Sequence, residues 1–351
     1  MSWKRHRLPI AGVVFAGLLA LAVWKLGERN EESAAIDPEA SALLPDLEGD
    51  DIDRLEIRRP DEEPIVLEKK GDAWVLTAPV KADADKTAVS TAVDKLDDLE
   101  VMDVAATKAA HHDKLEVSDE KAVHVIVGRD GGKEWVHLLI GAYRGGNTMV
   151  RKAGDDRVAA VKGSIKYAFN KPLRDWRDRH IVDVDAKRLV GLRFENDHGR
   201  FAFERSPGGT WKQAEGTTLE RFDPDKVASV ATALARMSAS DFAPADATPE
   251  TTGLGEGAAT VLLRIAPASA GQPDGGAPDG GAAAPSGPVE EIVLRLGSQV
   301  EGKEQFYLQR QGRDTIYVVS KYLADRLRPE ASRFQQPEKK EGEQEGGEQD
   351  G

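Results

Sequence analysis

The chain has 351 residues, of which 40% are hydrophobic and 31% are charged, and its formal net charge at neutral pH is −13. This length accommodates two domains of ordinary size, and the acidic balance argues against nucleic acid as a partner. Cysteine is absent, which excludes disulfide bonds, thiolate metal sites and a cysteine nucleophile.

The N-terminal segment has the pattern of a signal anchor. Residues 1–7 form a basic stub that is cytoplasmic in this interpretation, and residues 8–26 hold a run without charge from Leu8 to Trp24. A helix of this length, at ~1.5 Å per residue, covers a bilayer core, and the basic stub keeps the N-terminus in the cytoplasm. We therefore expect a single-pass protein of the inner membrane, with a transmembrane helix at 8–26 and its bulk in the periplasm. The alternative is a cleaved signal peptide with Ala20-Leu21-Ala22 as the cleavage site.

Two further segments have the composition of unfolded chain. Residues 27–45 are polar and alanine-rich, which is typical of a tether. Residues 335–351 consist mainly of Glu, Gln, Gly and Lys, and are predicted to form a disordered acidic tail because they have almost no apolar surface to bury.

An internal repeat fills the chain between the tether and the tail, with one copy at 46–180 and the second at 181–334. In each copy two strands and a glycine-containing turn precede a third strand that begins with Trp. The pairs that carry the repeat, each 137 positions apart, are Leu55 and Leu192, Ile57 and Phe194, Val66 and Phe203, Gly71 and Gly208, and Trp74 and Trp211.

A long amphipathic helix is predicted after the Trp strand of each copy. Asp223 followed by Pro224 is a favourable helix start, and Asp85 has the matching place in the first copy. The apolar residues at helical spacing are Val89, Ala92, Leu96 and Leu99 in the first copy, and Val227, Val230, Leu234 and Met237 in the second.

A β-hairpin follows in each copy, predicted at Ala122–Val127 and Trp135–Gly141, and at Ala259–Ile265 and Glu291–Gly297. Matching residues of the two copies are 137 positions apart at the start of this hairpin (Ala122 and Ala259) and 156 apart at its end (Gly141 and Gly297). The increase of 19 residues agrees within one with the length of the stretch 269–288. That stretch is rich in Ala, Gly and Pro, and predicts a flexible insertion at the hairpin tip.

Each copy closes with further strands and a short helix, around Ser164-Ile165-Lys166-Tyr167 and Ser320-Lys321-Tyr322. Together these elements predict an α+β fold. It consists of an N-terminal transmembrane helix followed by two tandem repeats of mainly antiparallel sheet, with one long amphipathic helix in each.

No motif predicts a catalytic residue or a cofactor: the phosphate loop, the G-x-S-x-G elbow and the H-E-x-x-H pattern are missing from the sequence. The candidates for metal binding are His124 and His137, which face each other across the hairpin if its turn centres between Asp130 and Gly131. The alternative, which we favour, is a polar pair on the less buried face of the sheet, because the second copy has no matching histidines.

The tryptophans have two interpretations each. Trp176 lies between the copies beside Arg174 and Arg177, and it either packs at the junction or contacts a partner protein; these three are the candidate interaction residues. Trp74 and Trp211 have the chemistry to stack on a sugar, but their matching positions at the start of a strand favour a place in the core.

Three segments in this order resemble the bacterial DUF4340 family, a domain of unknown function, over about residues 45–334. They are the Trp-containing segment 67–80, Leu139-Ile140-Gly141, and the run Lys171-Pro172-Leu173-Arg174-Asp175-Trp176-Arg177-Asp178-Arg179. The second copy also keeps Thr252-Gly253-Leu254, where the first has Asp113-Lys114-Leu115. The resemblance implies an accessory role in the cell envelope, beside ABC transporters of the gliding-motility type, and it supplies no catalytic residues.

We therefore expect a non-catalytic, membrane-anchored periplasmic module that binds envelope proteins, with ABC-transporter subunits among the candidate partners. We expect no cofactor and no nucleic acid. The alternatives are a periplasmic glycan-binding protein and an unrecognised hydrolase.

Overall fold

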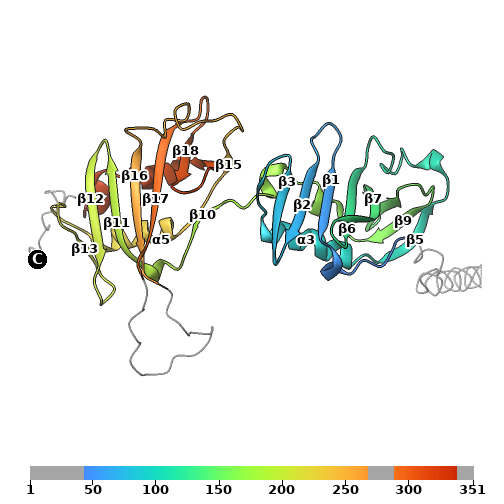
Figure 1. Cartoon of the computed structure of the whole chain (residues 1–351), viewed down its shortest axis with the longest axis horizontal. Coiled ribbons are helices and arrows are strands. Elements are labelled where there is room, and N and C mark those ends of the chain that lie inside the picture. The colour runs from blue at the N-terminus through green and yellow to red at the C-terminus, as the bar shows by residue number, and fades with distance from the viewer. Residues whose placement is uncertain (1–42, 268–287, 338–351) are drawn as a thin grey trace, which may run out of the picture. The chain divides into compact units, whose positions relative to one another are not determined.

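The computed structural model describes residues 43–267 and 288–337, and the chain separates into two compact units (Figure 1). Unit 1 is Met1–Asp178 and unit 2 is Arg179–Gly351. Each unit is built around one large sheet in which all neighbouring strands are antiparallel.

The sheet of unit 1 has nine strands, in the order β4-β3-β2-β1-β6-β7-β8-β9-β5. Helix α3 (Lys86–Asp97) lies against one face of this sheet through Val89, Ala92 and Leu96, and the short helix α4 (Lys166–Phe169) and 3-10 helix η3 (Leu173–Asp175) follow the last strand. The strands are β1 (Arg54–Arg58), β2 (Ile65–Lys70), β3 (Ala73–Ala78), β4 (Ala82–Asp83), β5 (Val101–Ala106), β6 (Val123–Arg129), β7 (Lys133–Arg144), β8 (Asn147–Lys152) and β9 (Val158–Lys162). Two further 3-10 helices are η1 (Gly49–Asp51) and η2 (Ala109–His111).

The sheet of unit 2 has eight strands in the order β13-β12-β11-β16-β17-β18-β19-β15, which is the order of unit 1 without β4. Its helices are α5 (Pro224–Ala235) and α6 (Lys321–Leu327), with 3-10 helices η4 (Ala186–Arg188) and η5 (Ala331–Phe334). The strands are β11 (Leu189–Asn196), β12 (Gly199–Arg205), β13 (Trp211–Gln213), β15 (Asp241–Phe242), β16 (Ala259–Ile265), β17 (Glu290–Gln299), β18 (Gln305–Arg310) and β19 (Ile316–Ser320). A separate pair, β10 (His180–Asp183) and β14 (Arg236–Ser238), adds a second small sheet.

The two long helices start in the way that their sequences predict. The side chain of Asp85 accepts a hydrogen bond from the backbone N–H of Ala88 at 2.8 Å, and Asp223 accepts one from Asp225 at 3.0 Å. Both aspartates therefore satisfy backbone donors that the first helical turn leaves free. Both helices end before the last apolar residue of the predicted pattern, since Leu99 follows α3 and Met237 lies in β14.

Strand registers correct one of the five pairs that define the repeat and the alignment of the first hairpin strands. Leu55 lies opposite Leu67 and Leu192 lies opposite Phe203, so Phe203 corresponds to Leu67 rather than to Val66. The first hairpin strand is also shifted by one, because Val123 faces Ile140 as Ala259 faces Leu296. The separation of the copies then grows by 20 residues along the hairpin, which is the length of 269–288; nearly all of that stretch lies outside the described residues.

After its long helix, each copy sends a connecting segment across the sheet face opposite that helix: strap 1 is residues 107–122 and strap 2 is residues 243–258. The backbone N–H of Ala142 donates to Leu115 in strap 1, and that of Ser298 donates to Thr252 in strap 2, both at 2.9 Å. Glu116 and Gly253 both have positive φ, of 57° and 68°. Hence the counterpart of Thr252-Gly253-Leu254 in unit 1 is Leu115-Glu116-Val117. The sequence alignment places it two residues earlier, at Asp113-Lys114-Leu115.

The expected fold class and location need correction. The described structure is predominantly antiparallel sheet with few helices, rather than α+β with a transmembrane helix. Among residues 43–267 and 288–337, no helix has the length and apolar character needed to cross a membrane, and the predicted helix at 8–26 lies outside these ranges. The expectation of a single-pass inner-membrane protein is therefore not supported. The predicted tether and acidic tail also lie largely outside the described residues.

Candidate functional site

The two candidate metal ligands form a hydrogen-bonded pair in unit 1. His124 in β6 and His137 in β7 are half-buried, and His124 Nδ1 lies 2.9 Å from His137 Nε2. They are diagonal neighbours rather than directly opposed, because the register shifts between Val127 and Gly128 and brings His124 opposite Leu139. The turn pairs Gly128 with Glu134, one register step beyond the assumed centre, and the β-bulge adds one further residue.

The hydrogen bonds of this pair favour a structural role over metal binding. His124 Nε2 lies 2.8 Å from the carbonyl oxygen of Asp119, which can only accept, so this nitrogen carries the proton. When both rings are neutral, Nδ1 of His124 must then accept a hydrogen bond from Nε2–H of His137. This hydrogen bond occupies the Nδ1 lone pair, through which His124 would otherwise bind a metal ion. Within the described ranges, no three His, Cys, Asp or Glu side chains group closely enough to hold a metal.

This pair makes the stability of unit 1 depend on pH. Burial lowers the pKa of His137, and so do the neighbouring His124 and Arg58, against the opposite effects of Glu134 and Asp119. Because the folded pKa lies below the unfolded value of about 6.5, the unfolded state binds more protons in mild acid, and stability falls as the pH drops below that value. The double variant His124→Thr/His137→Val, which introduces the residues of unit 2 (Thr260 and Val293), is expected to remove this loss. Urea unfolding at pH 7.5 and 5.5 measures it, and an equal loss in the variant and the parent chain would contradict the assignment.

The candidate interaction residue Trp176 is fully buried in the core of unit 1. It ends η3, and its carbonyl oxygen accepts the N–H of Asp85 at 2.9 Å. Phe334 ends η5 in unit 2, is equally buried, and accepts the N–H of Asp223 at the same distance. The two aromatic residues thus close corresponding cores, and Trp176 presents no surface to a partner.

The two candidate arginines differ in their surroundings. Arg174 is half-exposed, and its Nε lies 3.8 Å from Asp175 Oδ1. Arg177 pairs through its backbone with Ala84, as Gln335 pairs with Phe222 in unit 2. The closing run that is most specific in sequence therefore contributes Trp176 to the core of unit 1. Among its charged residues Arg174 is exposed and the others are half-buried.

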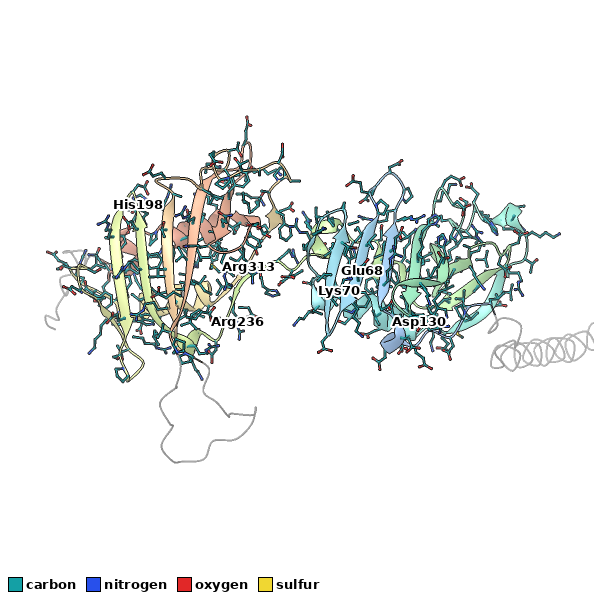
Figure 2. The ribbon with its side chains drawn as sticks, in the orientation of Figure 1. Glu68, Lys70, Asp130, His198, Arg236 and Arg313 are labelled. Atoms are coloured by element: carbon teal, nitrogen blue, oxygen red, sulfur yellow. The ribbon has the colours of Figure 1, made fainter. Side chains whose placement is uncertain are left out.

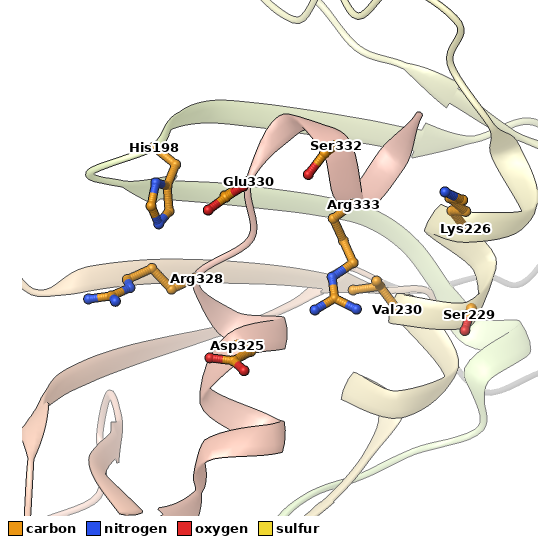
Figure 3. A pocket seen from close by; sticks show the side chains of 9 residues that line it. All are labelled: His198, Lys226, Ser229, Val230, Asp325, Arg328, Glu330, Ser332 and Arg333. Atoms are coloured by element: carbon orange, nitrogen blue, oxygen red, sulfur yellow. The ribbon is translucent and has the colours of Figure 1, made fainter. Parts of the chain in front are cut away.

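Unit 2 contains an open groove with a volume of about 690 Å³ between α5, the α6–η5 segment and the β11–β12 turn (Figure 3). Lys226 donates to the carbonyl oxygen of Gln335 at 2.5 Å, and Arg328 Nε lies 3.7 Å from Asp197 Oδ1. The lining residues are His198, Lys226, Ser229, Val230, Asp325, Arg328, Glu330, Ser332 and Arg333. This mixture of exposed acids, bases and hydroxyls offers hydrogen bonds, but it does not bring together a buried nucleophile and a base.

An exposed Lys-Tyr pair begins the short helix of each unit. Lys166-Tyr167 starts α4 after a three-residue connection from β9, and Lys321-Tyr322 starts α6 directly after β19. The tyrosines are 53% and 67% exposed, and they are two of four large hydrophobic residues that are exposed in the described part of the chain. In unit 2 the guanidinium of Arg326 stacks 3.4 Å from the centre of the Tyr322 ring.

Sequence reasoning aligned these two pairs but did not recognise them as a site. The signal was present, because identical residues recur in both copies at positions outside the apolar pattern of the core. Their exposure depends on how the short helices dock, and four to seven residues carry too little periodicity to predict it.

The model of the family described as domain of unknown function (DUF4340) matches residues 74–256, which is more than half of the chain. The protein belongs to this family. The match begins at Trp74 in β3 of unit 1 and ends at Glu256 in strap 2. No curated protein and no solved structure matches the chain.

Proposed function

We propose that this protein is a non-catalytic module that binds another protein through the Lys-Tyr pairs of its two units. The observation that carries the proposal is the exposure of Tyr167 and Tyr322, each of which is the second residue of the short helix of its unit. A tyrosine combines a large apolar ring with a hydroxyl group, and it loses little conformational entropy on binding, which makes it frequent at protein interfaces.

The cores do not require these tyrosines. Buried positions differ between the units, as Trp176 and Phe334 do, whereas the exposed pair is the same in both. Lys166 and Lys321 pair with Glu116 and Asp325 at 3.2 and 3.9 Å, which holds a charged rim beside each ring. Exposed apolar groups within a polar rim are typical of a binding surface.

The glycan-binding alternative depended on exposed tryptophans, and the structure does not favour it. Trp211 is only 3% exposed, and Trp74 packs against the core of unit 1. The family resemblance makes a subunit of an ABC transporter of the gliding-motility type the first partner to examine.

Loss of both tyrosines is expected to remove partner binding without unfolding the chain. In pull-downs of the tagged full-length protein, the variant Tyr167→Ser/Tyr322→Ser should recover at least about tenfold less transporter subunit than the parent chain, as expected for loss of two interface anchors. Tyr143→Ser is the matched control, because Tyr143 is 54% exposed but begins no short helix. Equal recovery by the double variant and the control would contradict the proposal.

A further inference from the structure

On the sheet face of unit 2 that strap 2 crosses at Gly297 and Ser298, a neighbouring area over β12, β11, β16 and β17 combines apolar side chains with arginines. In strand register, Arg193 on β11 lies between Ala202 on β12 and Leu262 on β16, and Leu262 lies beside Val293 on β17. The next row on the same face contains Glu195, Thr260 and Arg295. We call these residues the arginine face: Ala202, Arg193, Leu262, Val293, Glu195, Thr260 and Arg295.

The arginine face points away from the core. Its neighbours along each strand, such as Leu192, Val261 and Leu294, are buried at 0–2% exposure, and side chains alternate between the faces of a strand. Leu262 and Val293 are half-buried, while Arg193 and Arg295 are exposed. Figure 1 shows β12, β11, β16 and β17 side by side in front of the helices of this unit, which lie on the other side of the sheet.

The side chains of two arginines on this face have no partner within the described part of the chain: neither the guanidinium of Arg193 nor that of Arg295 forms a hydrogen bond or ion pair there. Other charges on the same side of the sheet are paired. Arg200 lies 2.6 Å from Glu195, and Arg264 lies 3.6 Å from Glu291. Free guanidinium groups beside half-buried aliphatic side chains offer both bidentate hydrogen bonding and apolar contact.

Unit 1 shows the same face with its charges satisfied. The counterpart of Arg193 is Glu56, which is 9% exposed and is bound by Arg54 at 2.5 Å and Arg58 at 2.6 Å. The counterpart of Arg295 is Leu139, which is fully buried. Glu68 and Lys70 on β2 form a further ion pair at 2.7 Å, and Figure 2 shows them close together in unit 1. In unit 1 the charged side chains named here therefore pair with one another. In unit 2 the guanidinium groups of Arg193 and Arg295 have no such partner among the described residues.

We propose that the arginine face of unit 2 binds an extended, acidic and partly aliphatic segment of a partner protein. Carboxylates of the segment pair with Arg193 and Arg295, and its aliphatic side chains cover Leu262 and Val293. The two arginines are separated by two strand spacings and two residues, roughly 12 Å between Cα atoms. Acidic residues four positions apart in an extended segment match that distance. This surface lies on the sheet and is independent of the Lys-Tyr pairs.

The test uses the fluorescent peptide Ser-Glu-Ser-Val-Ser-Glu-Ser-Val-Ser, with full-length protein and anisotropy as the readout. In an extended conformation this peptide places its two Glu side chains, four positions apart, and its Val side chains on the same face. Arg193→Glu and Arg295→Leu install the residues of unit 1, and each is expected to weaken binding by roughly tenfold or more, as expected for loss of a hydrogen bond to a charged group. Arg236→Glu is the matched control, because it makes the same charge change on β14, outside the arginine face. Binding of the parent chain should also weaken as salt is added.

Three results would overturn the assignment. One is equal binding by Arg193→Glu and Arg236→Glu when both variants melt at the temperature of the parent chain. Another is equal affinity for the same peptide with Lys in place of both Glu residues. The third is a rise in peptide affinity on removal of residues 338–351, which would assign the arginine face to the chain's own acidic segment instead of a partner.

Discussion

Replacing Trp176 by alanine is expected to lower the free energy of unfolding of unit 1 by about 3–5 kcal/mol, the range for removal of a large aromatic side chain from a packed core. The ring is fully buried, and the residue ties η3 to the start of α3 through the hydrogen bond from Asp85. Chemical denaturation followed by circular dichroism should show an earlier transition for unit 1 and an unchanged transition for unit 2.

Trp176→Phe is the control for this prediction, because Phe334 fills the corresponding place in unit 2. The indole N–H of Trp176 is buried without a hydrogen-bond partner among the described residues, so its removal offsets part of the lost packing. The phenylalanine variant should therefore lose much less stability than the alanine variant. Equal losses of stability in the alanine and phenylalanine variants would show that an aromatic ring at position 176 is not needed to fill the core of unit 1.

Replacing Gly297 by alanine is expected to destabilise unit 2 by about 3 kcal/mol or more, and Gly141→Ala should do the same in unit 1. A Cβ atom at Gly297 would overlap the carbonyl oxygen of Thr252, and one at Gly141 would overlap that of Leu115. Both glycines lie where a strap crosses its sheet, and the backbone of the strap must move to make room.

Gly255→Ala is the matched control, since Gly255 lies in strap 2 with an ordinary backbone conformation and no atom within 4 Å of an added Cβ. Thermal denaturation of the full-length chain compares the variants directly. If Gly297→Ala melted with Gly255→Ala, the close approach of strap and sheet would not be needed for stability.

Local patterns predicted much of the fold. The 137-residue spacing brought together Leu55 with Leu192 and Trp74 with Trp211, and each pair occupies corresponding places in the two sheets. The caps at Asp85 and Asp223 were predicted from residue type and are confirmed. Such features depend on a few neighbouring residues, so one sequence suffices to find them.

Features that depend on register or on distant contacts were not predicted. The bulge beside Gly128 shifts His124 relative to His137, and no composition signal marks it. Glu116 takes the positive φ that Gly253 has in strap 2, which hid the correspondence of the two straps. Trp176 gave no sign of its burial, because its charged neighbours resemble those of an exposed contact residue.

The candidate binding surfaces also combine features that the local sequence shows with features that depend on strand register and packing. The Lys-Tyr pairs were visible as a repeated sequence, but their exposure required the docked helices. The arginine face required the register of four strands and the comparison of Arg193 with Glu56. Both surfaces are proposed to bind proteins, and because they consist of different residues, substitutions in one can be tested without altering the other.

The most direct test of the proposed function is photocrosslinking from the two tyrosine positions. A photoreactive phenylalanine analogue is placed at Tyr167, Tyr322 or Tyr143 of the full-length chain in cells, and the crosslinked products are identified by mass spectrometry. We predict that Tyr167 and Tyr322 both crosslink to the same partner protein and that Tyr143 does not. Crosslinking that is absent at both positions, or equal at all three, would contradict a function in protein binding through the Lys-Tyr pairs.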